Sequence, residues 1–73
     1  MAHTQLIQLT INGNSRAFEE TRFTVAHLVA RMGLEGKRIA IERNGEIVPR
    51  TAFDSTLLAS GDALEIVGAV GGG

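Results

Sequence analysis

The residues best suited to take part in a chemical reaction in this 73-residue chain are its last three, Gly71, Gly72 and Gly73. Glycine has no Cβ, so a run of glycines adopts backbone angles that other residues avoid and can thread through a narrow opening. Such a segment cannot pack a core, but it can present the main-chain carboxylate of Gly73 to the active site of another protein. The alternative is a glycine-rich end that serves only as a linker or frayed terminus.

No other group of residues has the spacing of a catalytic or metal site. The chain contains no cysteine, which excludes disulfides, thiolate metal sites and cysteine nucleophiles. Its two histidines, His3 and His27, have no second ligand at a suitable spacing, so we expect no metal site. Gly33 and Gly36 follow the predicted helix instead of opening one, which argues against a phosphate-binding loop. We therefore expect a substrate, carrier or interaction module and not an enzyme.

Composition and charge exclude further classes of protein. The net charge is −1, and three phenylalanines are the only aromatic residues of the Phe, Trp and Tyr set, so neither a basic field nor a base-stacking platform for nucleic acid is expected. No apolar run approaches the roughly 20 residues of a transmembrane helix, and we see no signal peptide. The 44% apolar content is that of a small globular domain. We expect a cytoplasmic protein without a membrane or nucleic-acid partner.

Strands and hairpins follow from period-two alternation and from Asn-Gly pairs. Ile7, Leu9 and Ile11 alternate with polar residues, as in a strand with one buried face. Asn-Gly pairs at residues 12–13 and 44–45 predict hairpin turns, because both residue types tolerate positive φ. The predicted strands are residues 5–11, 15–19, 39–43, 46–48 and 63–67.

One short helix is predicted over residues 24–32. Thr24 is a suitable N-cap, Phe23 can pack onto the first turns, and Gly33 is a suitable left-handed residue after the last turn. Residues 50–60 are predicted to be irregular, with Asp54 as the cap of a single helical turn. The predicted core consists of Ile7, Leu9, Ile11, Phe18, Val25, Leu28, Val29, Ile41, Leu57, Leu58, Leu64 and Ile66, with Phe53 as a further candidate.

The order of the predicted elements indicates an α+β protein with the β-grasp, ubiquitin-like arrangement. A hairpin, one helix and three further strands form a five-stranded mixed sheet, with the first and last strands as a parallel central pair. The helix covers one face of the sheet, and the other face remains open for a partner. We expect a domain over residues 1–67 and a flexible glycine tail over residues 68–73. The Lys37-Arg38 pair is interpreted as a solvated loop, and Arg50 as part of a turn.

An Asn-Gly-x-Ile-Val-Pro-Arg stretch, a Gly-Asp pair before the final strand and a C-terminal diglycine, all in one short chain, are specific in combination. Together these stretches resemble the ThiS family, the sulfur carrier proteins of thiamine biosynthesis. The charged loop at residues 35–38 and a few extra N-terminal residues depart from the family pattern. The matching residues are 11–13, 24–25, 28, 39–50, 58, 61–67 and 71–73.

The resemblance implies how Gly73 is used. In the family a ThiF-like enzyme, with ATP and magnesium, adenylates the terminal carboxylate, and a sulfur donor such as a cysteine desulfurase then supplies sulfur. Gly73 becomes a thiocarboxylate, Gly71 and Gly72 thread the tail, and a ThiG-like thiazole synthase uses the sulfur. No cofactor is bound permanently by the carrier.

Three alternatives remain open at this point. The small subunit of molybdopterin synthase, a MoaD-like protein, has the same fold and the same reactive diglycine, as do ubiquitin-related modifiers. The compact length and residues 44–50 favour the ThiS family over the first of these. A β-grasp interaction module without carrier function would make the glycine tail irrelevant.

Overall fold

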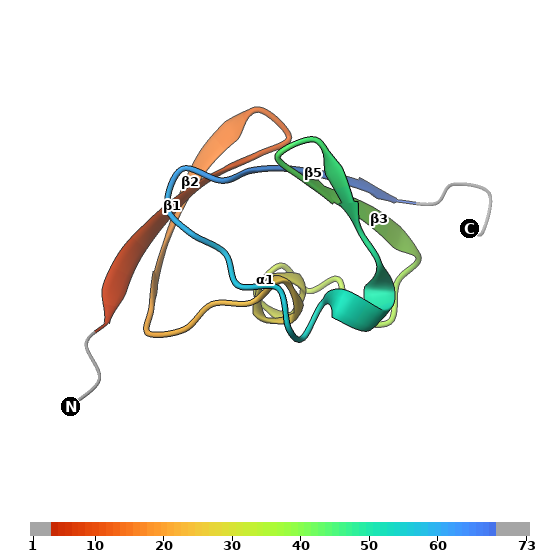
Figure 1. The fold of residues 1–73 in the computed structure, drawn as a ribbon, viewed down its shortest axis with the longest axis horizontal. Helices are drawn as coiled ribbons and strands as arrows, with labels where there is room; N and C mark the ends of the chain where they lie inside the picture. Colours follow the sequence, from red (N-terminus) through yellow and green to blue (C-terminus); the bar gives the residue numbers. More distant parts are fainter. Residues whose placement is uncertain (1–3, 69–73) are drawn as a thin grey trace.

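The structure is a computed structural model that describes residues 4–68, and these form one sheet with a single α-helix (Figure 1). Every predicted strand is present, and the predicted boundaries hold to within one residue at each end. The last strand extends one residue further than expected, to Gly68. The elements are β1 Gln5–Ile11, β2 Asn14–Glu20, α1 Val25–Arg31, β3 Ile39–Arg43, β4 Glu46–Val48, the 3₁₀ turn η1 Arg50–Ala52, and β5 Ala63–Gly68.

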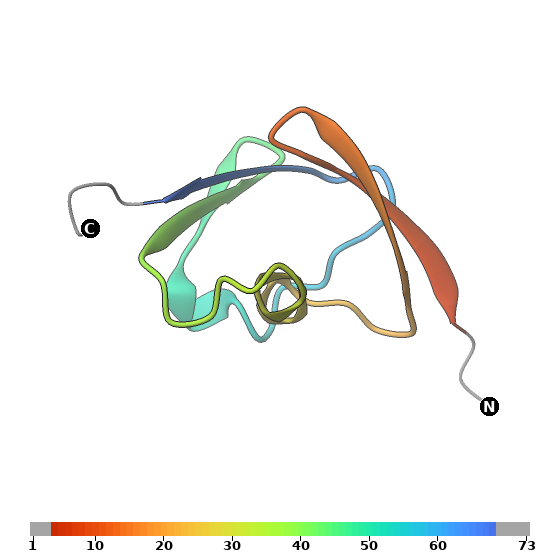
Figure 2. The same cartoon turned by 180° about the vertical axis from the view of Figure 1, so that it is seen from behind.

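The sheet has the strand order β2-β1-β5-β3-β4. β1 and β5 are parallel neighbours in the centre, and every other pairing is antiparallel. The sheet arches over α1, which crosses beneath its concave face, while the opposite face carries no element of residues 4–68 (Figures 1 and 2). The α+β, five-stranded β-grasp arrangement predicted from the sequence is confirmed.

The core lies between the concave face of the sheet and α1. Leu28 and Ile41 are fully buried, and Ile66 is half-buried against the same cluster. The prediction of a buried Leu57 is wrong, because this side chain is 46% exposed. Leu57 forms an isolated bridge with Thr24, and successive residues of extended backbone point in opposite directions, so only Leu58 turns inward.

The ends of α1 follow the sequence prediction and add one contact. Thr24 is the N-cap, and Gly33 after the helix has a φ of +70°. The hydroxyl of Thr24 accepts from the His27 N–H, while the Thr24 N–H donates to His27 Nδ1, each at 3.2 Å. His27 thus completes a capping box at the helix start.

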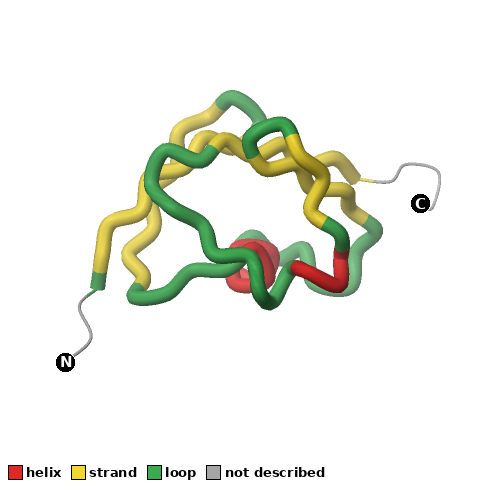
Figure 3. The backbone as a smooth tube through the Cα atoms, viewed as in Figure 1, coloured by secondary structure: helices red, strands yellow, loops and turns green. Residues whose placement is uncertain are grey.

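The connection from β4 to β5 is irregular, as predicted, but its helical turn begins elsewhere. Pro49 is the N-cap of η1, and Asp54 follows this turn instead of capping it, so that prediction is wrong. The proline has the fixed φ of −65° that suits the start of a turn. In Figure 3 this connection runs from the end of β4, past α1, to the start of β5.

The predicted glycine tail lies almost wholly outside the described residues. Gly68 is its first residue, and it ends β5 opposite Ile39. The predicted flexibility and the division at residues 67 and 68 therefore stay predictions. Within residues 4–68, no helix has the length and apolar character needed to cross a membrane.

Candidate functional site

The last strand determines where the glycine tail leaves the domain. β5 lies between β1 and β3, and its final residue, Gly68, is paired with Ile39 at the start of β3. Gly73, the predicted sulfur-carrying residue, lies outside the described residues, as do Gly71 and Gly72, which are predicted to thread the tail. Because an extended residue spans at most about 3.6 Å, Gly73 can reach no further than about 18 Å beyond Gly68.

Asn12 anchors β5 near this exit. β1 ends at Ile11, yet the side chain of Asn12 continues its pairing with β5: Asn12 Oδ1 accepts from the Ile66 N–H at 2.7 Å, and Nδ2 donates to the Ile66 carbonyl at 3.0 Å. The backbone φ of Asn12 is +51°, as the hairpin turn requires. The sequence predicted the turn but not the anchor, which joins residues 54 positions apart.

We expect Asn12→Gly to loosen β5 locally, because glycine accepts the positive φ but removes both side-chain hydrogen bonds. The free energy of unfolding should fall by about 1 to 2 kcal/mol, the net value of two such bonds. Hydrogen exchange of the Ile66 amide should accelerate more than that of the Leu64 amide, which lies two residues nearer the start of the strand. Unchanged exchange at Ile66 would show that the anchor contributes nothing.

Asp62 organises the opposite end of β5. Its carboxylate accepts from Arg43 Nε at 2.8 Å, from Asn44 Nδ2 at 3.0 Å and from the Ala59 N–H at 2.9 Å. Asn44 Oδ1 in turn accepts from the Ala63 N–H at 2.9 Å. This network joins the β3–β4 turn to the first residue of β5, which explains why an Asp stands directly before the strand.

The pKa of Asp62 depends on two opposing effects. Burial raises the pKa of this carboxyl, but the hydrogen bonds from Ala59, Arg43 and Asn44 outweigh burial and hold the pKa below its ordinary value of 3.8. A carboxyl with a depressed pKa in the folded state stabilises the fold above its ordinary pKa and loses that contribution as the pH falls through the lowered value.

We therefore expect Asp62→Asn to destabilise the protein by about 2 kcal/mol at neutral pH, the scale of a hydrogen bond to a charged group. The difference from wild type should shrink as the pH falls below 3.8 and through the lowered pKa, where the wild-type carboxyl becomes protonated. Urea unfolding of both proteins across this range measures the difference, with Asp54→Asn at an exposed position as the control. A stability gap that does not vary with pH would contradict this account.

The described residues bring together no catalytic constellation. The ring of His27 is engaged in the helix cap, and Glu20 forms an ion pair with Arg31. Among residues 4–68, no cluster of three or more His, Cys, Asp or Glu side chains is placed to hold a metal ion. The structure instead offers surfaces, on the open face of the sheet and around the end of β5.

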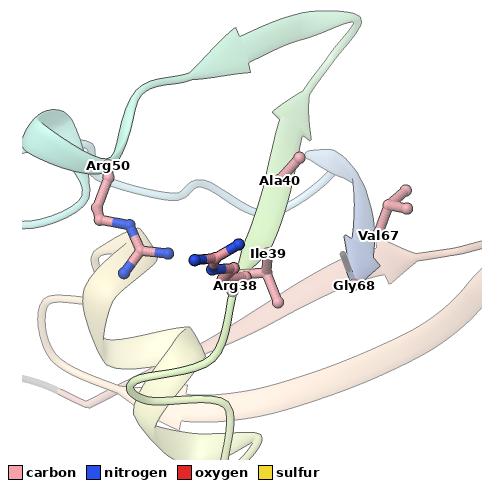
Figure 4. A pocket seen from close by; sticks show the side chains of 6 residues that line it. All are labelled: Arg38, Ile39, Ala40, Arg50, Val67 and Gly68. Atoms are coloured by element: carbon pink, nitrogen blue, oxygen red, sulfur yellow. The ribbon is translucent and has the colours of Figure 1, made fainter. Parts of the chain in front are cut away.

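The open face carries exposed apolar side chains near the end of β5. Val67 is 61% exposed and is paired with Ala40 of β3. Ile47 of β4, opposite Glu42, is 63% exposed on the same face. Beside them lies a shallow hollow, shown in Figure 4, which is lined by Arg38, Ile39, Ala40, Arg50, Val67 and Gly68.

This hollow is lined by residues that are distant in the sequence and that no sequence pattern connects. Arg38 lies in an exposed loop and Arg50 in a turn, as the sequence predicts, and both also line the hollow at the end of β5. Their proximity depends on how the β4–β5 connection packs against the start of β3. No local pattern in the sequence signals this packing.

Comparison with known protein families decides the family. Residues 8–73 match the model of the ThiS family, which is nearly the whole chain and includes the three terminal glycines. The chain belongs to the ThiS family. The resemblance found in the sequence, carried by the Asn-Gly-x-Ile-Val-Pro-Arg stretch and the Gly-Asp pair, is thereby confirmed.

Individual ThiS-family relatives agree with this assignment. The chain is 35% identical over 65 residues to the sulfur carrier protein ThiS of Bacillus subtilis, covering 89% of this chain and 98% of that protein. A crystal structure of the thiamine biosynthesis protein ThiS from Geobacter metallireducens has a TM-score of 0.79 at 32% identity, covering 92% of this chain and all of that one.

A third relative is a longer protein. The chain is 40% identical over 67 residues to a thiazole synthase of Paramagnetospirillum magneticum, covering 92% of this chain. The matched segment is 20% of that protein, so the chain spans about one fifth of its length. A ThiS-family segment thus occurs within a protein named as a thiazole synthase.

Proposed function

We propose that this protein is a sulfur carrier of thiamine biosynthesis and that it carries sulfur as a thiocarboxylate on Gly73. The observation that carries the proposal is the ThiS-family match, which runs through residue 73 and so includes the glycine tail. The Bacillus relative named as a sulfur carrier supports it. Partner enzymes recognise the folded domain, which presents the tail to their active sites.

The first step activates the carboxylate, which is a poor electrophile because its leaving group would be oxide. A ThiF-like partner binds ATP and magnesium, and a Gly73 carboxylate oxygen attacks the α-phosphorus of ATP. The α–β phosphoanhydride bond breaks, pyrophosphate leaves, and an acyl-adenylate forms. Magnesium, held by the partner, stabilises the charge on the phosphates.

The second step exchanges AMP for sulfur. The terminal sulfur of a persulfide, formed by a cysteine desulfurase, attacks the acyl carbon, and AMP leaves with the former carboxylate oxygen. The product is an acyl disulfide, and a thiol reductant cleaves its S–S bond to release the thiocarboxylate while the thiol is oxidised to a disulfide. Glycine suits this position because no side chain blocks approach to the acyl carbon.

The final step delivers the sulfur to a ThiG-like thiazole synthase, which returns the carrier with a free carboxylate. The thiazole synthase of Paramagnetospirillum, which contains a segment similar to this chain, supports this pairing. We propose that the protein has no enzymatic activity of its own and acts in the cytoplasm. The absence of cysteine is compatible with that reducing compartment.

The test is the intact mass of the protein after incubation with a purified ThiF-type enzyme, ATP, magnesium and sulfide. In this assay sulfide itself displaces AMP, so the expected product has one oxygen replaced by one sulfur. Fragmentation should place the sulfur on Gly73. A protein that forms neither adenylate nor thiocarboxylate under these conditions would contradict the proposal.

A second experiment separates the thiamine branch from the molybdopterin branch. The loaded protein is offered to a thiazole synthase with its other substrates and, separately, to the large subunit of molybdopterin synthase with its precursor. Sulfur should leave the carrier only in the first case. Transfer to the molybdopterin precursor would favour the MoaD-like alternative.

A further inference from the structure

Cationic side chains gather beside the end of β5, where the tail leaves the domain. Lys37 and Arg38 directly precede β3, and Arg50 is the first residue of η1. All three are exposed. Figure 4 shows the guanidinium groups of Arg38 and Arg50 turned toward each other across the hollow that Gly68 also lines. Two permanent positive charges therefore face solvent next to the end of β5, where the tail leaves the domain.

These charges are not neutralised within residues 4–68. The ion pairs of that part of the chain are Arg31 with Glu20 and Arg43 with Asp62, and neither includes Arg38 or Arg50. Arg50 donates one hydrogen bond, from Nη2 to the Lys37 carbonyl at 3.1 Å, which ties η1 to the loop before β3. Within the described part of the chain, most of its five N–H donors have no acceptor.

The cluster is local, because the chain as a whole has a net charge of −1. Two acidic side chains, Glu35 and Asp54, line the adjacent hollow with Arg50, but neither forms an ion pair with it. The lining of the hollow also includes Ala40 and the 61% exposed Val67, which add apolar surface near the arginines. Apolar surface with arginine beside it is the composition typical of protein–protein interfaces.

We propose that Arg38 and Arg50 form a docking site for carboxylate side chains of the adenylating partner, with Ala40 and Val67 packing against apolar residues beside those carboxylates. The inference rests on the proposed function and adds a recognition surface to it. Arginine binds carboxylates through paired N–H donors, and exposed arginines are frequent binding hot spots in interfaces.

The reach of the tail determines which anion the arginines meet. For Gly73 to enter an active site through a narrow opening, residues 69–73 extend up to about 18 Å from Gly68. Arg38 and Arg50 line a hollow with Gly68, at the near end of that span. With the tail extended into the active site, Arg38 and Arg50 lie toward the entrance, so the acceptor that we assign to them is a carboxylate on the partner's surface and not a phosphate of ATP.

The chemistry of the tail favours the adenylating enzyme as the occupant. Before loading, residues 71–73 offer no side chain that distinguishes this carboxylate from other C-termini. The enzyme that activates it must therefore recognise the folded domain. After loading, the thiocarboxylate sulfur itself distinguishes the carrier for the enzyme that consumes it.

The test uses charge reversal with a matched control. Arg38→Glu, Arg50→Glu and the double variant are compared with Arg22→Glu, which makes the same charge change at an exposed position before α1. Pyrophosphate release by a purified ThiF-type enzyme is measured against carrier concentration at saturating ATP. The double variant should raise the KM for the carrier by on the order of a hundredfold, the scale for lost interfacial charge pairs.

Three further readouts make the result specific to docking. At saturating carrier, the kcat should stay within about twofold of wild type, because Gly73 still reaches the active site once the complex forms. Added salt should raise the KM of wild type more than that of the double variant. Arg38→Glu removes no hydrogen bond of the described structure, so this single variant tests the site without disturbing the Arg50–Lys37 contact.

The outcomes separate this inference from the proposed function. If wild type releases no pyrophosphate, the proposed function fails and the docking site fails with it. If wild type is adenylated and the double variant has the same KM, or Arg22→Glu raises the KM equally, the docking site is overturned while the carrier function stands. If reversal impairs only sulfur transfer to a thiazole synthase, the assignment to the adenylating partner is overturned.

Discussion

Removal of Gly73 is expected to abolish thiocarboxylate formation without lowering the melting temperature. The truncation moves the reactive carbon back by at most about 3.6 Å. A misplacement of about 1 Å can already cost on the order of a hundredfold in rate. Stability should be unaffected because the buried core identified in residues 4–68 ends with Leu64. Thermal unfolding and intact mass after incubation with a ThiF-type enzyme, ATP and sulfide measure the two effects.

Two variants with an intact Gly73 complete this experiment. One extra residue after Gly73 displaces the carboxylate, and amidation of Gly73 removes it, so neither protein should acquire sulfur. Both should unfold at the wild-type temperature. If the truncated or amidated protein takes up sulfur as readily as wild type, Gly73 is not the carrier site, and an interaction module without carrier function becomes the better account.

The strands could be predicted because their signals are local. Alternation along residues 5–11 assigns one face to the core, and the Asn-Gly pairs define the turns. Asn12 and Asn44 have φ values of +51° and +52°, the left-handed conformation that this dipeptide tolerates. The helix likewise carries its own start and stop signals in Thr24 and Gly33. Local rules therefore sufficed for the order of elements, and the order restricted the topology.

The errors arose where tertiary contacts decide. Both Leu57 and Leu58 were placed in the core, but the bridge between Leu57 and Thr24 fixes an extended backbone that admits only one of the two. The sequence predicts for Phe23 only a contact with the start of the helix, yet its side chain is 1% exposed and its ring centroid lies 5.0 Å from that of Phe18. Neither outcome can be read from residue spacing within a single segment.

The features of the candidate site likewise fall into those that the sequence predicts and those that depend on tertiary contacts. The glycine tail is a property of composition and could be recognised directly, although its residues lie outside the described part of the chain. The Asn12 anchor, the Asp62 network and the pairing of Arg38 with Arg50 join segments between 12 and 54 residues apart. Such contacts follow only from the folded topology, which places β1 and β3 on either side of β5 and β4 beyond β3.

Leu64→Ala should have the largest effect on stability. Leu64 is 1% exposed on β5 and is paired with Ile11 on one side and Arg43 on the other. Replacing a buried leucine by alanine costs about 2.7 to 5 kcal/mol, because the lost side chain leaves a cavity in a close-packed core. In so small a domain each kcal/mol lowers the melting temperature by about 4 to 8 °C. Thermal and urea unfolding measure the loss, and Leu57→Ala, the same change at an exposed leucine, is the control with little expected effect.

The variant also tests whether partners need the folded domain. Leu64→Ala leaves the glycine tail intact, so below its melting temperature it should acquire sulfur from a ThiF-type enzyme, ATP and sulfide at nearly the wild-type rate. Above that temperature, but below the melting temperature of Leu57→Ala, loading of Leu64→Ala should be lost while the control is still loaded. If unfolded Leu64→Ala is loaded as fast as the folded control, the enzyme recognises the tail alone. The folded domain would then play no part in recognition, and the surface at Arg38 and Arg50 would have no part in selecting the carrier.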